Sequence, residues 1–246
     1  MSRKFVSLIT LWTLMILAGC ASFEKTVPVY KPSDELVLLA HGLGRSDWSM
    51  RKLEEQLEIA GYKVCSLDYP TIGESVDSVL SETRHQIDAC IVSAPKVHFV
   101  GHSLGGLVIR AYLQEHKTTI EPARMGKVVL MGTPNKGSEL ADHFSDSWLM
   151  KVGGGISHAL MTGNNSLGNT LEELNLNIGV IAGTKSSSLT SERFDGLNDG
   201  LVSVESAKLK NMSDFVMIDV NHTQMRSSSE VIEQTIHFLQ NGRFRH

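Results

Sequence analysis

The sequence predicts an α/β domain with a mostly parallel sheet of about six strands and helices on both faces. Apolar runs of strand length follow one another along the chain, and helix-forming segments or long connections separate them. The runs are continuously apolar instead of alternating with polar residues, which is typical of strands buried on both faces of a parallel sheet. The predicted strands are Leu36–Ala40, Tyr62–Leu67, Val97–Val100, Lys127–Met131, Ile178–Ala182 and Phe215–Val220.

Helices are predicted where apolar residues recur at helical spacing. They are Asp47–Ala60, Ser75–Val92, Leu104–Glu115 and Ser228–Leu239. The first carries apolar side chains from Trp48 to Ile59 and stops at Gly61, and the second ends shortly before Pro95. The third follows the third strand almost at once, so only a sharp turn fits between them.

The segment Asn135–Asn177 breaks this alternation, because no strand is expected in it and three consecutive glycines stand at 153–155. Long insertions in compact domains are usually functional or disordered, and apolar content favours a folded one. The apolar residues are Trp148, Leu149, Met150, Val152, Ile156, Leu160 and Met161. We expect residues 135–177 to form a small mobile cap with the glycines as its hinge. The alternative is that Trp148, Leu149 and Ile156 simply pack on the core.

Residues 1–20 have the pattern of an export signal. Arg3 and Lys4 precede a short apolar run that ends in Leu-Ala-Gly-Cys at Cys20. This ending resembles the lipobox of bacterial lipoproteins, in which the cysteine is lipidated and becomes the new N-terminus. The resemblance implies a signal peptide over 1–20, a tether over 21–34 and a domain over 35–246. An ordinary signal peptide and an uncleaved anchor are the alternatives.

Lipidation at Cys20 would attach the chain to a membrane of the bacterial cell envelope. Ala21, rather than an acidic residue, follows the cysteine. This resembles the lipoproteins sorted to the outer membrane, so we expect the protein there, facing the periplasm or the surface.

Composition argues against a nucleic-acid partner but does not decide whether the cysteines are bonded. The chain holds 23 Lys and Arg against 27 Asp and Glu, a net charge of −4, and no basic cluster. A nucleic-acid partner therefore has no electrostatic support. Cys65 and Cys90 either form a disulfide in an oxidising compartment or stay as buried thiols. Cysteine and histidine show no metal-ligand spacing, so neither a metal nor another cofactor is expected.

The motif Gly101-His102-Ser103-Leu104-Gly105-Gly106 lies directly between the third strand and the third helix. A serine held on such a strand-to-helix turn is exposed and lies at a helix N-terminus, where amide groups can face a developing oxyanion. Glycines at 101 and 105 leave room for the turn because they have no Cβ. Ser103 is therefore the predicted nucleophile.

A serine nucleophile needs a histidine base and an acid that orients it, and in this arrangement both follow the serine in the chain. His222 comes directly after the last strand, whereas His237 lies on the last helix and His246 is the terminus. His222 is the predicted base. Asp199, in a loop followed by an apolar pair, is the predicted acid, and Asp195 is its rival.

The expected oxyanion donors are two backbone amides. One belongs to the residue after the nucleophile, Leu104, and the other to Leu43 in the loop after the first strand. His41 and Gly42, in the same loop, look catalytic at first sight, but such a pair more often shapes the loop than transfers protons.

Together these motifs resemble the α/β-hydrolase superfamily, and in detail bacterial triacylglycerol lipases and esterases. The carrying motifs are His41-Gly42-Leu43-Gly44, the Ser103 hexapeptide, Gly132-Thr133-Pro134-Asn135-Lys136-Gly137-Ser138 and Asn198-Asp199-Gly200-Leu201-Val202. The resemblance covers residues 36–241 and implies an α/β-hydrolase fold with a small cap. The chain is shorter than typical secreted lipases of this type, and the aspartate pair that holds calcium in some relatives is not identifiable.

The resemblance implies a serine hydrolase of carboxylic esters, with an acyl-ester or lipid substrate, Ser103 as nucleophile, His222 as base and Asp199 as acid. Acyl transfer and thioester cleavage share the first half-reaction and remain alternatives. A surface lipoprotein that keeps the fold only for binding is a third alternative.

Overall fold

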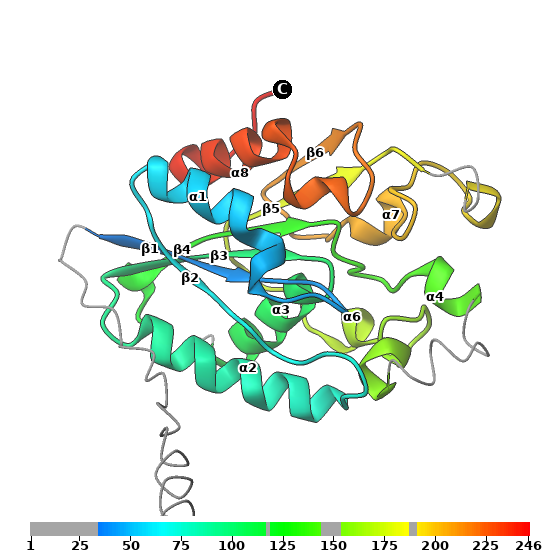
Figure 1. Cartoon of the computed structure of the whole chain (residues 1–246), viewed down its shortest axis with the longest axis horizontal. Helices are drawn as coiled ribbons and strands as arrows, with labels where there is room; N and C mark the ends of the chain where they lie inside the picture. Colours follow the sequence, from blue (N-terminus) through cyan, green and yellow to red (C-terminus); the bar gives the residue numbers. More distant parts are fainter. Residues whose placement is uncertain (1–33, 117–118, 144–153, 187–190) are drawn as a thin grey trace, which may run out of the picture.

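A computed structural model describes residues 34–116, 119–143, 154–186 and 191–246. Its centre is a sheet of six strands in the order β2-β1-β3-β4-β5-β6, and every neighbouring pair is parallel (Figure 1). The strands are β1 (Glu35–Ala40), β2 (Lys63–Ser66), β3 (Lys96–His102), β4 (Met125–Met131), β5 (Ile178–Gly183) and β6 (Asp214–Ile218). The predicted α/β fold class is confirmed.

Helices cover both faces of this sheet. The longer ones are α1 (Arg51–Ile59), α2 (Val76–Ile91), α3 (Leu104–His116) and α8 (Ser229–Asn241). The shorter ones are η1 (Asp47–Met50), η2 (Pro122–Arg124), α4 (Glu139–His143), α6 (Leu167–Thr170), η3 (Ser191–Arg193), α7 (Val204–Ala207) and η4 (Gln224–Arg226). In Figure 1, α1 and α8 lie on one side of the sheet, and α2 and α3 lie on the other.

Alternate residues of β1 explain why its sequence is continuously apolar. Leu36 and Leu38 belong to the core under α2 and α3, whereas Val37 and Leu39 belong to the core under α1 and α8. All four side chains are fully buried. A strand with helices on both of its faces has no solvent side, so polar residues would lie in a core.

The predicted helix Asp47–Ala60 differs from the structure in two ways. Its first turn is the 3₁₀ helix η1, and the α-helix begins only at Arg51. Trp48 and Ile59, expected on the apolar face, are 69% and 77% exposed. The buried residues of α1 are Leu53 and Leu57, which are four residues apart and therefore share one face of the helix.

The structure joins Cys65 of β2 to Cys90 of α2 in a disulfide. This selects one of the two states that the sequence left open. The bond connects an edge strand to the helix that follows it, over a sequence separation of 25 residues. Neither cysteine lines the cavity described below.

The insertion between β4 and β5 is described except for residues 144–153. Residues 154–158 are helical, and Ile156 is fully buried in the core under α2 and α3. A Cβ on Gly154 would collide with the backbone of Gly73 and Glu74. The described part of the insertion is thus packed on the domain. For Ile156 this agrees with the alternative that the residue packs on the core. Trp148, Leu149 and Gly153 of the predicted cap lie outside the described residues.

The N-terminal predictions also lie outside the described residues, since these begin at 34. They include the signal peptide, Cys20 and almost all of the tether. Within the described ranges, no helix is both long enough and apolar enough to cross a membrane.

Candidate active site

Ser103 occupies a sharp turn between β3 and α3. Its φ of 56° is the only positive φ of a non-glycine residue in the described part of the chain. Such a conformation costs free energy and is typical of functional turns. The backbone is close on two sides, because a Cβ on Gly105 would overlap the Ala40 carbonyl and one on Gly101 would press on Gly106. The turn therefore requires glycines where the motif has them.

His222 and Asp199 form a buried pair beside this turn. Nδ1 of His222 lies 2.7 Å from Oδ2 of Asp199, and the His222 amide donates to the Asp199 carbonyl at 2.9 Å. The other carboxylate oxygen, Oδ1, accepts the amides of Leu201 and Val202 at 2.9 and 2.8 Å. Asp199 is 2% exposed, whereas its rival Asp195 is exposed. The structure thus brings Asp199, and not Asp195, to His222.

The other candidate histidines lie elsewhere. His237 on α8 makes its hydrogen bond with the Arg243 carbonyl, and the terminal His246 pairs with Asp214. A Cβ on Gly132, directly after β4, would lie 3.1 Å from both His222 Nδ1 and Asp199 Oδ2. His222 and Asp199 therefore pack against the backbone of Gly132, directly after β4, where a larger residue would crowd them.

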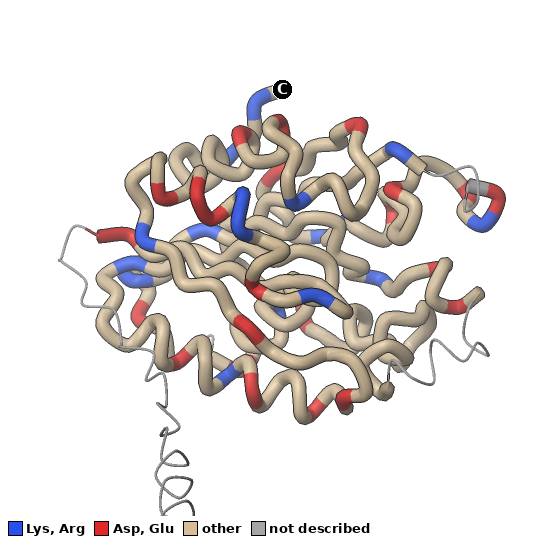
Figure 2. The backbone as a smooth tube through the Cα atoms, viewed as in Figure 1, with Lys and Arg blue, Asp and Glu red and all other residues tan. Residues whose placement is uncertain are grey.

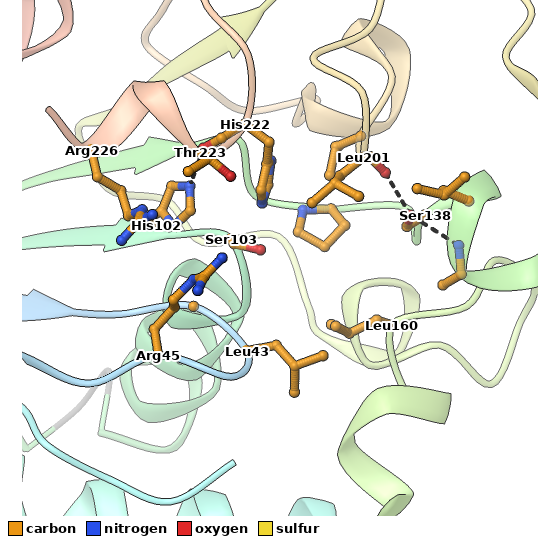
Figure 3. Close-up of a pocket in the computed structure, with 15 residues that line it drawn as sticks. Leu43, Arg45, His102, Ser103, Ser138, Leu160, Leu201, His222, Thr223 and Arg226 are labelled. Atoms are coloured by element: carbon orange, nitrogen blue, oxygen red, sulfur yellow. Dashed lines mark hydrogen bonds between the residues drawn. The ribbon is translucent and has the colours of Figure 1, made fainter. Parts of the chain in front are cut away.

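A cavity of about 270 Å³ connects Ser103 with His222, which both line it. In Figure 3, Leu43, Leu160 and Leu201 lie on one side of Ser103, and Arg45, His102 and Arg226 lie on the other. The full lining is Gly42, Leu43, Arg45, His102, Ser103, Pro134, Ser138, Leu140, Ala141, Leu160, Leu201, Val202, His222, Thr223 and Arg226. The cavity thus has one apolar end and one basic end, with the serine between them.

The two predicted oxyanion donors are positioned around Ser103. Leu104 is the first residue of α3, where an amide has no partner within its helix. The Leu43 amide has no hydrogen-bond acceptor among the described residues. The Leu43 side chain lines the cavity. Amides without a partner at these two places can hydrogen-bond an oxyanion formed on a substrate bound to Ser103.

His102 has a structural role that the motif did not reveal, since it occupies a variable position of the Gly-x-Ser-x-Gly pattern. Its Nε2 lies 3.0 Å from the His222 carbonyl oxygen and must donate, because a carbonyl only accepts. Burial, helped by the neighbouring His222 and by Arg226 and Arg45, holds the pKa of His102 well below its usual range. A neutral His102 therefore ties the nucleophile turn to the base loop.

His41 shapes its loop, as expected, and does not face the cavity. Its ring stacks on Tyr69 with centroids 4.1 Å apart, and its Nδ1 donates to the Gly42 carbonyl at 2.9 Å. The Tyr69 hydroxyl donates to the His41 carbonyl at 2.6 Å. Burial lowers the pKa of His41, so the ring is neutral near pH 7. These contacts fix the backbone that carries Leu43.

Comparison with known proteins identifies the fold family but not the substrate. A family model described as the alpha/beta hydrolase fold matches residues 35–157. The 2-hydroxy-6-oxononadienedioate/2-hydroxy-6-oxononatrienedioate hydrolase of Escherichia coli K12 is 36% identical over 118 residues, which are 44% of this chain and 39% of that protein. The chain thus spans about two fifths of the length of the curated relatives it matches. That relative's name gives an oxo acid as its substrate, rather than an ester.

Two solved structures share the architecture. The mature lipase BlEst2 of Bacillus licheniformis has a TM-score of 0.63 at 21% identity, covering 86% of this chain and 92% of that one. A metagenomic carboxyl esterase has a TM-score of 0.59 at 19% identity, with coverages of 80% and 67%. At these identities the likeness concerns the fold. The match of the family model to half of the sequence shows that the chain belongs to the α/β-hydrolase family of enzymes.

Proposed function

We propose that this protein is a serine hydrolase of carboxylic esters whose substrates carry an acyl chain. One observation carries the proposal: Ser103 and His222 line one cavity, and a buried Asp199 lies 2.7 Å behind His222. A binding module has no need of this set of three groups in one place. A hydrolase that works through an acyl-enzyme needs all three.

The geometry supports a two-step reaction. Because Nδ1 of His222 faces Asp199, its Nε2 is the nitrogen left to accept the Ser103 proton. The Ser103 oxygen attacks the ester carbonyl, and the oxyanion is held by the Leu43 and Leu104 amides. His222 then returns the proton to the leaving alcohol, which releases it and leaves an acyl-enzyme. Water, deprotonated by His222, hydrolyses the acyl-enzyme and restores Ser103 with no cofactor.

The apolar end of the cavity supports an acyl substrate. Leu140, Ala141 and Leu160, all from the insertion, line it together with Leu201. Burying methylene groups there contributes about 0.8 kcal/mol each. An apolar wall also excludes water from the reacting ester until the alcohol has left. We therefore assign this end to the acyl chain.

Labelling with a fluorophosphonate probe tests the nucleophile, and a series of acyl esters of graded chain length tests the substrate class. We expect covalent labelling of the wild type, no labelling of Ser103→Ala, and faster hydrolysis of medium or long chains than of acetate. An unlabelled wild type would support the binding-only alternative. Cleavage of oxo acids but of no ester would replace the ester proposal with the chemistry of the E. coli relative.

The same active site allows acyl transfer and thioester cleavage. The partition between them depends on what reaches the acyl-enzyme, so parallel assays with an acyl thioester and with a competing alcohol distinguish the three. We expect free fatty acid as the main product. A dominant new ester would identify a transferase instead.

We also propose that the domain is attached to the bacterial envelope, in the outer membrane, through lipid on Cys20. The Leu-Ala-Gly-Cys ending and the disulfide between Cys65 and Cys90 support this, since disulfides persist in exported proteins. Cys20→Ser should release the protein from the membrane fraction or block its maturation, while the domain keeps its turnover. Mass spectrometry that finds no lipid on the mature N-terminus would contradict the anchor.

A further inference from the structure

Two arginines define the end of the cavity opposite the leucines. Arg45 lies in the loop after β1, and Arg226 lies at the end of η4, four residues after His222. In Figure 3 their guanidinium groups approach the region of Ser103 and His102 from two sides. Burial together with both charges lowers the pKa of His102, and burial together with the charge of Arg45 lowers that of Arg226, in keeping with two arginines that line one cavity.

Neither arginine has an anionic partner in the described part of the chain. No carboxylate there lies within ion-pair distance of either guanidinium. Arg226 donates from Nη1 to the Ser49 carbonyl at a long 3.3 Å, and its buried Nε has no hydrogen-bond partner. Asp47, two residues after Arg45, accepts the Trp48 amide instead. Two neighbouring positive charges without a counter-charge are unfavourable unless a ligand supplies one.

Arg45 and Arg226 are not part of a larger basic region of the described chain. Figure 2 shows Lys and Arg spread over many elements of the described backbone, while Asp and Glu predominate along α2. The arginines are therefore a local feature of the cavity. Because Ser103 lies between them and the apolar end, an ester with its acyl chain among the leucines directs its alcohol portion toward the guanidinium groups.

We propose that the substrate is an acyl ester whose alcohol portion carries a phosphate group, bound by Arg45 and Arg226, as in acylated glycerol phosphates. The inference rests on the proposed ester hydrolysis. Guanidinium groups bind phosphate through paired N–H···O bonds. One guanidinium satisfies both oxygens of a carboxylate, whereas a phosphate has enough oxygens for two. The presence of two arginines therefore favours phosphate.

Three soluble esters with the same acyl chain test this: octanoylglycerol, octanoylglycerol phosphate and octanoylglycerate, which has a carboxylate in place of the phosphorylated CH2OH group. We expect wild-type kcat/KM to be about 10-fold to 100-fold higher for the phosphate than for octanoylglycerol, since charged hydrogen bonds contribute about 1.5–3 kcal/mol. Arg45→Gln and Arg226→Gln should each remove most of this preference, so the ratio of the two kcat/KM values is compared with that of the wild type. Arg45→Lys should keep part of it.

Arg84→Gln is the matched control, because Arg84 is paired with Glu115 on the surface of another cavity. It should keep the full preference. Arg226 is half-buried, so its variant is checked for folding by circular dichroism, and the exposed Arg45 provides the variant that leaves packing intact. Added salt should lower the wild-type rate on the phosphate ester more than that on octanoylglycerol.

The outcomes separate the two proposals. Ser103-dependent hydrolysis of octanoylglycerol without a preference for phosphate, or a preference that survives in both arginine variants, overturns this inference alone. Equal preference for octanoylglycerate overturns the choice of phosphate. If none of the three esters is cleaved, or if Ser103→Ala cleaves them as fast as the wild type, the proposed function itself fails.

Discussion

The strand ends and the insertion after β4 contribute to the same cavity but are built differently. Ser103, Asp199 and His222 follow β3, β5 and β6, and each was predicted from its immediate sequence. The insertion supplies Leu140 and Leu160, and its shape depends on contacts with distant elements. Parallel strands deliver their carboxyl ends to one edge of the sheet, so position in the chain was sufficient for the first group. Position in the chain was not sufficient to predict how the insertion folds.

One buried side chain of α3 donates hydrogen bonds to three residues of the described insertion. Arg110, in the middle of α3, donates to Asn135 Oδ1 at 3.0 Å and to the carbonyls of Gly168 and Leu171 at 3.2 Å each. It is 2% exposed, and burial lowers its pKa to about 10. A guanidinium remains charged at pH 7 there because carbonyl oxygens replace water around it. The three candidate catalytic residues thus follow strands of the sheet, whereas the insertion is held by contacts with other elements, such as those of Arg110 and of the buried Ile156.

The largest effect is expected where the strand ends supply the nucleophile and base. Ser103→Ala and His222→Ala should each lower turnover by about 10⁶-fold, by analogy with other serine triads. Ser103→Ala should fold, because the Ser103 hydroxyl contributes little packing, and circular dichroism checks the fold of His222→Ala. Hydrolysis of a nitrophenyl ester measures the loss, with His237→Ala as a control that keeps its activity. Substantial turnover in folded Ser103→Ala would remove the nucleophile assignment.

Asp199→Asn should lower turnover by about 10⁴-fold, less than loss of the serine, because the acid orients His222 and stabilises its charged form. Asp195→Asn, in the same loop but exposed, should change turnover little. Steady-state kinetics of the two variants decide between them. An exchange of these two behaviours would move the acid role to Asp195 in spite of the observed pairing.

These two predictions concern residues that the sequence identified. Other residues have roles that could not be predicted from the sequence. All six strands were predicted within a few residues, since a helix-covered parallel strand must be apolar throughout. Arg110 gives no local signal, because nothing in an apolar helix tells which distant carbonyls it will meet. The same holds for His102 and Arg226, whose roles follow from neighbours more than 100 residues away, His222 and Ser49.

Removing the Arg110 hydrogen bonds to the insertion should lower the free energy of unfolding more than it changes the catalytic step. Arg110→Met leaves the Asn135 and Gly168 oxygens without their donor, which we expect to cost roughly 3 kcal/mol in the free energy of unfolding. Urea denaturation measures this, and Arg84→Met on the surface should shift it by less than about 0.5 kcal/mol. Hydrolysis of long-chain esters should fall more than that of acetate. Unchanged stability would show that the insertion is held elsewhere.

The smallest effect concerns the wall that the insertion gives to the acyl chain. Leu160 is 8% exposed and lines the cavity, while its backbone carbonyl accepts the Ser138 amide at 2.8 Å. Leu160→Asn keeps that backbone bond and makes the wall polar. We expect kcat/KM for octanoate esters to fall about 10-fold and that for acetate to stay within about twofold, since a methylene or two in an apolar pocket carries 1–3 kcal/mol.

Leu176→Asn is the matched control for this change. It also replaces a leucine of the insertion, but Leu176 lines a different cavity and is not among the residues that line the cavity at Ser103. It should lower both rates equally or neither. The ratio of octanoate to acetate rates is the informative quantity, because a general loss of folded protein cancels in it. If Leu160→Asn also lowers both rates equally, the insertion only packs on the domain, and acyl-chain preference must be determined at the strand ends, by Leu43 and Leu201.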